Sequence, residues 1–215
     1  MPSWWSSARL AATRELLFRE LQHRVSNNLQ MVAALLTVQR RKIADPEAKL
    51  ALDEASRRLG VIGRISRQLH DPTGAGKDLP AFLDQLARDV IETSGHANIT
   101  HHVSGISPNG LGPEAAIPLA LVVAEAIANS IEHGFANRED ACRVDIRVRS
   151  TADHRLQVEV EDDGCGLPVG FTLEQSESLG LKIATMLASQ LGGNFTLQPG
   201  ISGTLARLEL PLAAT

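Results

Sequence analysis

The feature that most constrains this chain is a long amphipathic stretch near its start. No glycine or proline occurs between Leu10 and Ala44, and apolar residues recur every three or four positions. This pattern predicts one helix over residues 10–43. Two seven-residue ladders run along it: Leu17, Arg24, Met31 and Val38 form one, and Leu21, Asn28 and Leu35 form the other. Such ladders are typical of the seam of a helical bundle.

A second helix is predicted directly after a short break. Asp45 can cap a helix, and Pro46 and Glu47 suit its first turn, so the helix is expected over residues 46–69. A connection this short predicts an antiparallel hairpin. Each helix carries two ladders, and one hairpin cannot bury all of them. We therefore expect a homodimer in which two hairpins form a four-helix bundle.

The composition changes after the hairpin and divides the chain. Residues 71–78 contain one proline and two glycines, which predict a linker between a helical hairpin over residues 1–70 and a second domain over residues 79–215. In that domain helices are expected over residues 80–93, 113–135 and 179–191, and strands over 98–104, 143–149, 156–161, 195–198 and 204–210. This order predicts an α+β sandwich with helices on one face of a mostly antiparallel sheet.

Charge and composition argue against several classes of protein. The formal net charge of −4 gives no basic surface for nucleic acid. No apolar run approaches the length of a membrane span, about eighteen residues. Cys142 and Cys165 stand alone, without metal-ligand spacing, and favour a reducing compartment. With no secretory signal evident near the N-terminus, a cytoplasmic location is expected.

Two motifs in the second domain suit a nucleotide. Glu125 and Asn129 stand four apart on a predicted helix and share one face, where a carboxylate and a carboxamide suit hydrated Mg²⁺ beside phosphate oxygens. Asp162 comes at the end of a predicted strand, just after residue 161, and Gly164 and Gly166 behind it admit a ligand close to the backbone. A buried carboxylate there can accept a hydrogen bond from the amino group of adenine, whereas the carbonyl of guanine would be repelled. Taken singly, each pattern is more often a solvated helix face or a plain turn.

A third motif opens the last predicted helix. Residues 178–182 read Ser-Leu-Gly-Leu-Lys, and backbone N–H groups at a helix N-terminus favour phosphate. Gly180 lets a ligand approach them closely. Residues 167–177 are long enough to form a short lid, and Thr204 begins the last strand.

In this order the three motifs resemble the ATP-binding (Bergerat-type) fold shared by gyrase, Hsp90, MutL and histidine kinases, over residues 79–213. Upstream, His23-Arg24 followed by Asn27 resembles the HRxxN class of bacterial sensor histidine kinases. The Trp-x-Glu pattern of the related class named for His, Trp and Glu is absent from the sequence of the glycine loop. The resemblance implies a two-component signalling kinase that takes the γ-phosphate of ATP onto His23 and passes it to an aspartate of a response regulator.

The same resemblance implies a role for each matching residue. His23 and Glu125 would be catalytic, together with Asn27, and Asn129 would hold Mg²⁺ and the nucleotide. The remaining nucleotide-binding residues would be His133, Asp162, Gly164, Gly166, Leu179, Gly180, Leu181 and Thr204. An imidazole is largely neutral near pH 7 and attacks phosphorus without a strong base, so His23 is a chemically sensible acceptor.

Two residues depart from the family pattern. Glu132 stands where a lysine is common and Asp163 where an asparagine is common, and both add negative charge near a triphosphate. No sensor domain fits before His23, so the chain is either a piece of a longer kinase or takes its input from a separate sensor protein. The alternative function is a phosphotransfer adaptor or phosphatase with a weakened ATP-binding domain. A third is a non-catalytic regulator similar to anti-sigma factors, against which the hairpin with its histidine speaks.

Overall fold

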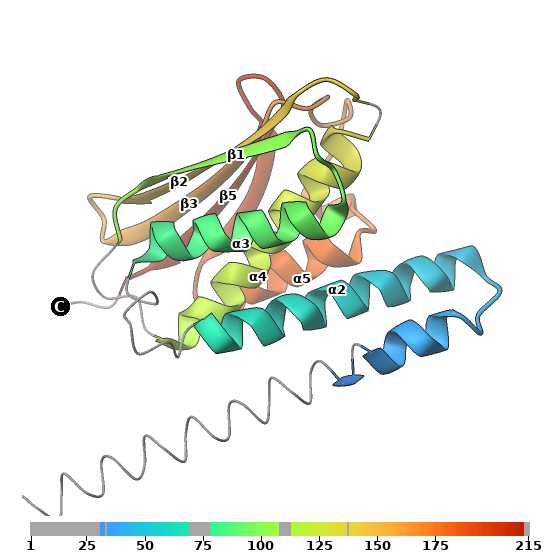
Figure 1. The fold of residues 1–215 in the computed structure, drawn as a ribbon. Coiled ribbons are helices and arrows are strands. Elements are labelled where there is room, and N and C mark those ends of the chain that lie inside the picture. Colours follow the sequence, from blue (N-terminus) through green and yellow to red (C-terminus); the bar gives the residue numbers. More distant parts are fainter. Residues whose placement is uncertain (1–30, 33, 69–77, 108–112, 137, 213–215) are drawn as a thin grey trace, which may run out of the picture. The chain divides into compact units, whose positions relative to one another are not determined.

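The structure is a computed structural model that describes residues 31–32, 34–68, 78–107, 113–136 and 138–212 (Figure 1). The chain divides into two compact units, residues 1–72 and 73–215, and each is treated by itself. The predicted phosphoacceptor His23 and its neighbour Asn27 lie outside the described residues.

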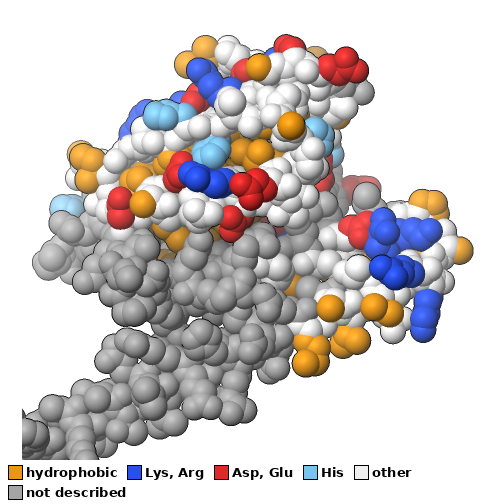
Figure 2. All heavy atoms as spheres, viewed as in Figure 1, with side chains coloured by type: hydrophobic (Ala, Val, Ile, Leu, Met, Phe, Trp, Pro, Cys, Tyr) orange, Lys and Arg blue, Asp and Glu red, His pale blue; other side chains and the backbone are white. Residues whose placement is uncertain are grey.

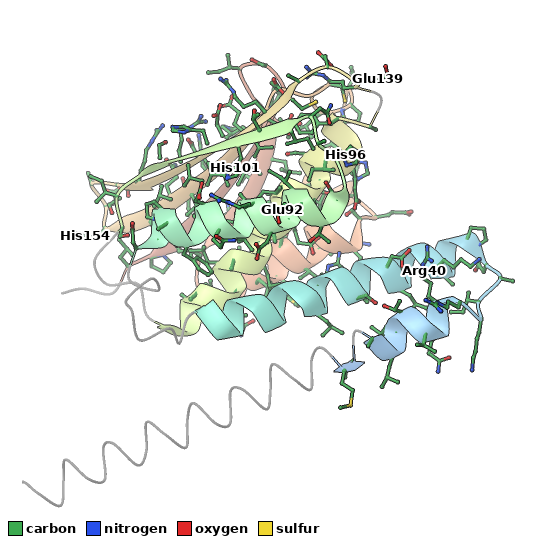
Figure 3. All side chains as sticks on the ribbon, in the orientation of Figure 1. Arg40, Glu92, His96, His101, Glu139 and His154 are labelled. Atoms are coloured by element: carbon green, nitrogen blue, oxygen red, sulfur yellow. The ribbon has the colours of Figure 1, made fainter. Side chains whose placement is uncertain are left out.

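The first unit contains two helical segments joined by a tight turn. Residues 34–40 are helical, a turn covers residues 41 and 42, and helix α2 spans Pro46–Gln68. Across the turn, Arg40 Nε donates to Asp53 Oδ2 at 2.6 Å, and Figure 3 shows Arg40 at this end of the unit. The expectation that the first helix runs to residue 43 was wrong, because the backbone closes a turn with short-range bonds from residues 42 and 43 to residues 39 and 40.

The second unit is a five-stranded sheet with helices on one face (Figure 1). Its long helices are α3 (Leu79–Ser94), α4 (Pro113–Asn129) and α5 (Leu179–Gln190), and its strands are β1 (Ile99–Gly105), β2 (Cys142–Ser150), β3 (Arg155–Asp162), β4 (Asn194–Pro199) and β5 (Thr204–Pro211). The strand order is β1-β2-β3-β5-β4, in which β1 pairs with β2 in parallel and all other pairs are antiparallel. The predicted α+β sandwich is confirmed.

An aliphatic core joins the sheet to its helices. Helix α3 packs on β1 and β2, α4 on β3, and α5 on β4 and β5. Leu83, Leu119, Ile127, Ile146 and Leu156 are all completely buried. Burying one such side chain contributes about 1.5–3 kcal/mol, so these contacts hold the helices against the sheet.

Strand β3 alternates between the two faces of the sheet. Val158 and Val160 are buried among the core residues, whereas Glu159 and Glu161 point to the opposite face. Glu159 is buried there by its ion pairs with Arg147 at 3.1 Å and Arg207 at 2.9 Å. Because side chains on a strand alternate, Asp162 falls on the helix-facing side with the valines.

Helix α4 ends in a widened turn that the sequence did not predict. The expected helix to residue 135 gives way at residue 130 to a π-helical turn over Ser130–Gly134. The N–H of Phe135 bonds to the carbonyl of Ser130 at 3.0 Å, a five-residue spacing in place of the usual four. The extra residue changes the direction of every side chain that follows Asn129, and such turns are frequent at functional sites.

One described helix is long and apolar enough to cross a membrane, contrary to the expectation that no run approaches that length. It is Ala115–Gly134, and 61% of its apolar window is buried inside the fold. Its alanines and valines pack between α3 and α5, which accounts for the apolar composition of a core helix. Length and composition alone are weak evidence for a membrane segment.

An uncovered apolar stripe on residues 31–38 leads to a prediction about self-association. Met31, Leu35 and Val38 share one helix face and are each more than half exposed, and hydrophobic side chains gather along this segment in Figure 2. We expect the stripe to be covered by the same stripe of a second copy. Leu35→Asp places a charge in that seam and should convert a dimer into a monomer, measured by light scattering at micromolar concentration.

Thr37→Asp is the matched control, because Thr37 is also exposed but lies on another face of the helix. The wild type should run as a dimer and Thr37→Asp should leave it so. A monomeric wild type, or a Leu35→Asp variant that stays dimeric, would contradict the proposed seam.

Candidate functional site

A cavity of about 440 Å³ opens at one end of the second unit, where α4, the glycine loop after β3 and the start of α5 meet. Its walls are mostly apolar, with a few polar groups, as in most small-molecule sites. The residues that line it are Ala126, Asn129, Ser130, Glu132, His133, Gly134, Ala136, Val160, Asp162, Cys165, Gly166, Leu167, Pro168, Phe171, Ser176, Ser178, Leu181, Leu197, Thr204 and Ala206.

Asp162 supplies a buried carboxylate to this cavity. The residue is only 4% exposed. Its Oδ1 accepts from the N–H groups of Gly164 at 2.9 Å and Thr204 at 3.0 Å, and its Oδ2 accepts from the hydroxyl of Ser130 at 2.9 Å. Among the described residues, Oδ2 therefore accepts one hydrogen bond where it can accept two. The open position suits a donor such as an amino group on a ligand.

Two glycines allow the backbone to close around that carboxylate. A Cβ at Gly203 would lie 2.3 Å from Asp162 Oδ1, and a Cβ at Gly164 would lie 2.7 Å from the Cα of Gly134. Any side chain at either position would push the loops apart. Gly164, predicted as a ligand-binding residue, is not among the residues that line the cavity, and the close approach of Gly134 leaves no room for a side chain there.

Asn129 lines the same cavity and carries a buried amide nitrogen without a partner in the part of the chain that the structure describes. Among buried side-chain nitrogen and oxygen atoms of the described residues, Nδ2 of Asn129 is the one with no hydrogen-bond partner. A buried unpaired donor costs about 1–3 kcal/mol, so this group fits a ligand acceptor. Glu125 lies one turn earlier on α4 and does not line the cavity.

The lid and the start of α5 form the outer wall. Residues 167–177 include a short 3-10 helix, Leu173–Gln175, and Phe171 reaches the cavity. Ser178 caps α5 by accepting from the N–H of Leu181 at 3.4 Å, and Leu181 lines the cavity. Two other predicted residues do not line it: Gly180 is buried, and Leu179 is half exposed.

The glycine loop and the π-turn are bonded to each other. The N–H of Cys165 donates to the carbonyl of Gly134 at 3.1 Å, and its Sγ lies 3.4 Å from the carbonyl oxygen of His133. His133, predicted as a nucleotide-binding residue, and Glu132 both line the cavity. Ser130 and Phe171 were missed, although Ser130 is adjacent to Asn129 and its hydroxyl was a visible signal.

Asp163, which we expected to add negative charge near a triphosphate, does not line the cavity. Its Oδ1 accepts from the N–H of Arg143 at 2.9 Å and lies 3.4 Å from Arg138 Nη1. It turns away because strand side chains alternate, so the residue after an inward-facing Asp162 faces the other side.

Comparisons with known families agree with this geometry. Residues 20–94 match the family described as histidine kinase, and residues 114–214 match the family of histidine kinase-, DNA gyrase B- and HSP90-like ATPases. The first match includes His23, Arg24 and Asn27 of the HRxxN motif. The chain belongs to the sensor histidine kinases that carry this ATP-binding domain.

Individual relatives point to the same family. The chain is 36% identical over 211 residues to the sensor histidine kinase PdtaS of Mycolicibacterium smegmatis, covering 95% of this chain and 41% of that protein. It is 28% identical over 200 residues to blue-light-activated histidine kinase 2 of Erythrobacter litoralis, covering 90% of this chain and 56% of the relative. The chain therefore spans about half or less of these relatives.

A solved structure supports the fold. The blue-light activated histidine kinase EL346 of Erythrobacter litoralis matches with a TM-score of 0.67 and 26% identity, over 90% of this chain and 58% of that one. The ATP-binding fold expected from the motifs is thus confirmed.

The hydrogen bonds of Glu161, on the sheet face opposite the helices, lead to a prediction about how stability depends on pH. Glu161 Oε1 accepts from the N–H of Ile201 at 2.7 Å, and Oε2 lies 2.5 Å from Arg147 Nη2. The Ile201 amide first, and then Arg147, hold the pKa of Glu161 below its ordinary value of 4.5. The resulting stability is complete above pH 4.5 and is lost as the pH falls through the lowered pKa. Glu161→Gln should unfold at lower urea concentration than wild type at pH 7.

The difference between Glu161→Gln and wild type should shrink as urea unfolding curves are taken from pH 7 towards pH 3. Glu174→Gln, a change at an exposed position of the lid, is the control and should follow wild type throughout. A constant difference at all pH values would show that the charge of Glu161 adds no stability.

Proposed function

We propose that this chain forms the kinase portion of a two-component signalling protein, transferring the γ-phosphoryl group of Mg-ATP to His23 and then to an aspartate of a response regulator. The observation that carries the proposal is the cavity in which a buried carboxylate with one open acceptor position lies near an unsatisfied buried amide. The family membership supports the same reading.

The base of the nucleotide is read by Asp162. Its Oδ1 already accepts two backbone hydrogen bonds, so only Oδ2 is available for the exocyclic amino group of adenine. A guanine base would present a carbonyl oxygen to the same carboxylate and would be repelled. The apolar side chains of Val160, Leu197 and Ala206 suit the faces of the purine ring.

The phosphates are held at the other side of the cavity. The carboxamide of Asn129 would hold Mg²⁺ through its oxygen and phosphate through its orphaned nitrogen, with Glu125 one turn away. When bound, Mg²⁺ neutralises phosphate charge and orients the transferred group. Gly166, Leu181 and the N–H groups that begin α5 would border the phosphate chain beneath the lid.

The acceptor is His23, and Asn27 stands one helical turn further on. A neutral imidazole nitrogen attacks phosphorus directly, so positioning supplies most of the catalysis. Asn27 would position the water that removes phosphate from the partner regulator, since a carboxamide both donates to and accepts from water. A separate sensor protein or a further segment of the chain would deliver the input.

The nucleotide site gives the first test of this function. Asp162→Asn removes the anionic acceptor and should weaken ATP binding roughly ten- to a hundred-fold, which is the value of a hydrogen bond to a charged group. Asn129→Ala should weaken binding of Mg-ATP in the same way. Titration calorimetry with Mg-ATP measures both, and absence of binding by the wild type would favour the phosphotransfer adaptor or phosphatase.

The phosphoacceptor gives the second test. His23→Ala should abolish labelling by ATP carrying a labelled γ-phosphate, because no other histidine in the sequence is followed by the Arg-x-x-Asn of the motif. The label on the wild type should be lost in acid, kept in base, and transferred to a response regulator. His154→Ala, at a β-turn of the second unit, should label normally. Label that persists in His23→Ala would assign the acceptor to another residue.

Glu132 gives the third test, because it is exposed and lines the cavity. Its negative charge opposes a triphosphate, so Glu132→Lys should tighten ATP binding several-fold, with a larger gain at low salt. Glu139→Lys makes the same charge change at an exposed position outside the cavity and controls for overall charge. Equal ATP affinity in wild type and Glu132→Lys across a salt series would show that Glu132 does not act on the phosphates.

A further inference from the structure

Ser130 is the first residue of the π-turn that follows α4, and it lines the cavity. The residue is 6% exposed, and its Oγ lies 2.9 Å from Asp162 Oδ2 and 3.2 Å from the carbonyl oxygen of Ala126. A hydroxyl has one proton to donate. The carboxylate is both nearer and charged, so the proton goes to Asp162.

This bond fixes the one oxygen that faces a ligand. Oδ1 is saturated by the amides of Gly164 and Thr204, so those amides restrain the carboxylate on one side only. Ser130 restrains the other side by occupying one acceptor position of Oδ2, which leaves the second position available to the cavity. Without the hydroxyl, Oδ2 would lose its protein partner among the described residues.

The π-turn is what brings the hydroxyl to this place. Its first residue, Ser130, bonds to Asp162, and its last, Gly134, accepts from the amide of Cys165 in the glycine loop. The turn therefore bonds to the glycine loop at Asp162 and at Cys165, and Asn129, directly before the turn, lines the same cavity.

We infer that Ser130 is a positioning residue for base selection: its hydroxyl orients Asp162 Oδ2 so that the site prefers a purine with a 6-amino group. The inference rests on the proposed ATP site. It assigns to Ser130 a contribution that depends on the 6-amino group of the ligand. A purely structural role would instead change the affinity for every nucleotide alike.

The test compares two nucleotides in each protein: ATP, and purine riboside triphosphate, which carries hydrogen in place of the amino group. Titration calorimetry with Mg²⁺ present should show that the wild type prefers ATP roughly tenfold. Ser130→Ala should lose roughly three- to ten-fold in ATP affinity while its affinity for the analogue stays nearly unchanged. The ratio of the two affinities is insensitive to a loss of folded protein, because both ligands meet the same preparation.

Ser130→Thr restores a hydroxyl and should recover the preference for ATP. Ser150→Ala is the matched control: Ser150 is exposed and lies six residues along β2 from Val144, the partner of Asp162. An equal loss for both nucleotides in Ser130→Ala, or an unchanged preference, would overturn the inference while leaving the ATP site intact. A wild type that binds neither nucleotide would overturn both the inference and the proposed site.

Discussion

The structure of the second unit depends on burying one carboxylate. Asp162 is almost fully enclosed, and an ionised group in that position is tolerated only because its oxygens are hydrogen-bonded. The partners come from three separate segments: the glycine loop, the start of β5 and the end of α4. Satisfying this one group therefore fixes the relative positions of the elements that make the cavity. The same requirement that stabilises the site leaves one acceptor position open for a ligand.

The rest of the site follows from how closely backbone can approach that carboxylate. Gly203 and Gly164 leave no room for a side chain beside Asp162 and Gly134. Their role is one of packing, which positions the amides that donate to Oδ1. The lid, by contrast, has a short 3-10 helix and apolar side chains that are partly exposed, and the hydrogen bonds that hold Asp162 come from other segments.

The sequence was sufficient to predict the helices and strands of the second unit and the two residues at the centre of the site, Asp162 and Asn129. Helix and strand bounds in the second unit came within two residues, except at the end of α4, because apolar periodicity and glycine mark them directly. The π-turn could not be predicted from the sequence, because a single turn with hydrogen bonds five residues apart leaves no periodic pattern of apolar residues. The orientation of Asp163 follows from strand alternation, a local rule that the sequence-based expectation did not apply to this residue. The positions of Leu179 and Gly180 depend on how α5 packs, which is a tertiary fact that neighbouring residues in the sequence do not contain.

The alternation along β3 has a consequence for how the protein reaches its native state. Inward-facing valines and Asp162 alternate with outward-facing Glu159 and Glu161, which find their arginines only on the outer face. A strand paired one residue out of register would put both glutamates in the aliphatic core and the valines in water. Mispairing is thus disfavoured by side chains on both faces of the strand that ends in Asp162. The strand register that buries the valines also places Asp162 on the side of the cavity. Correct pairing of β3 and correct placement of this carboxylate therefore occur together.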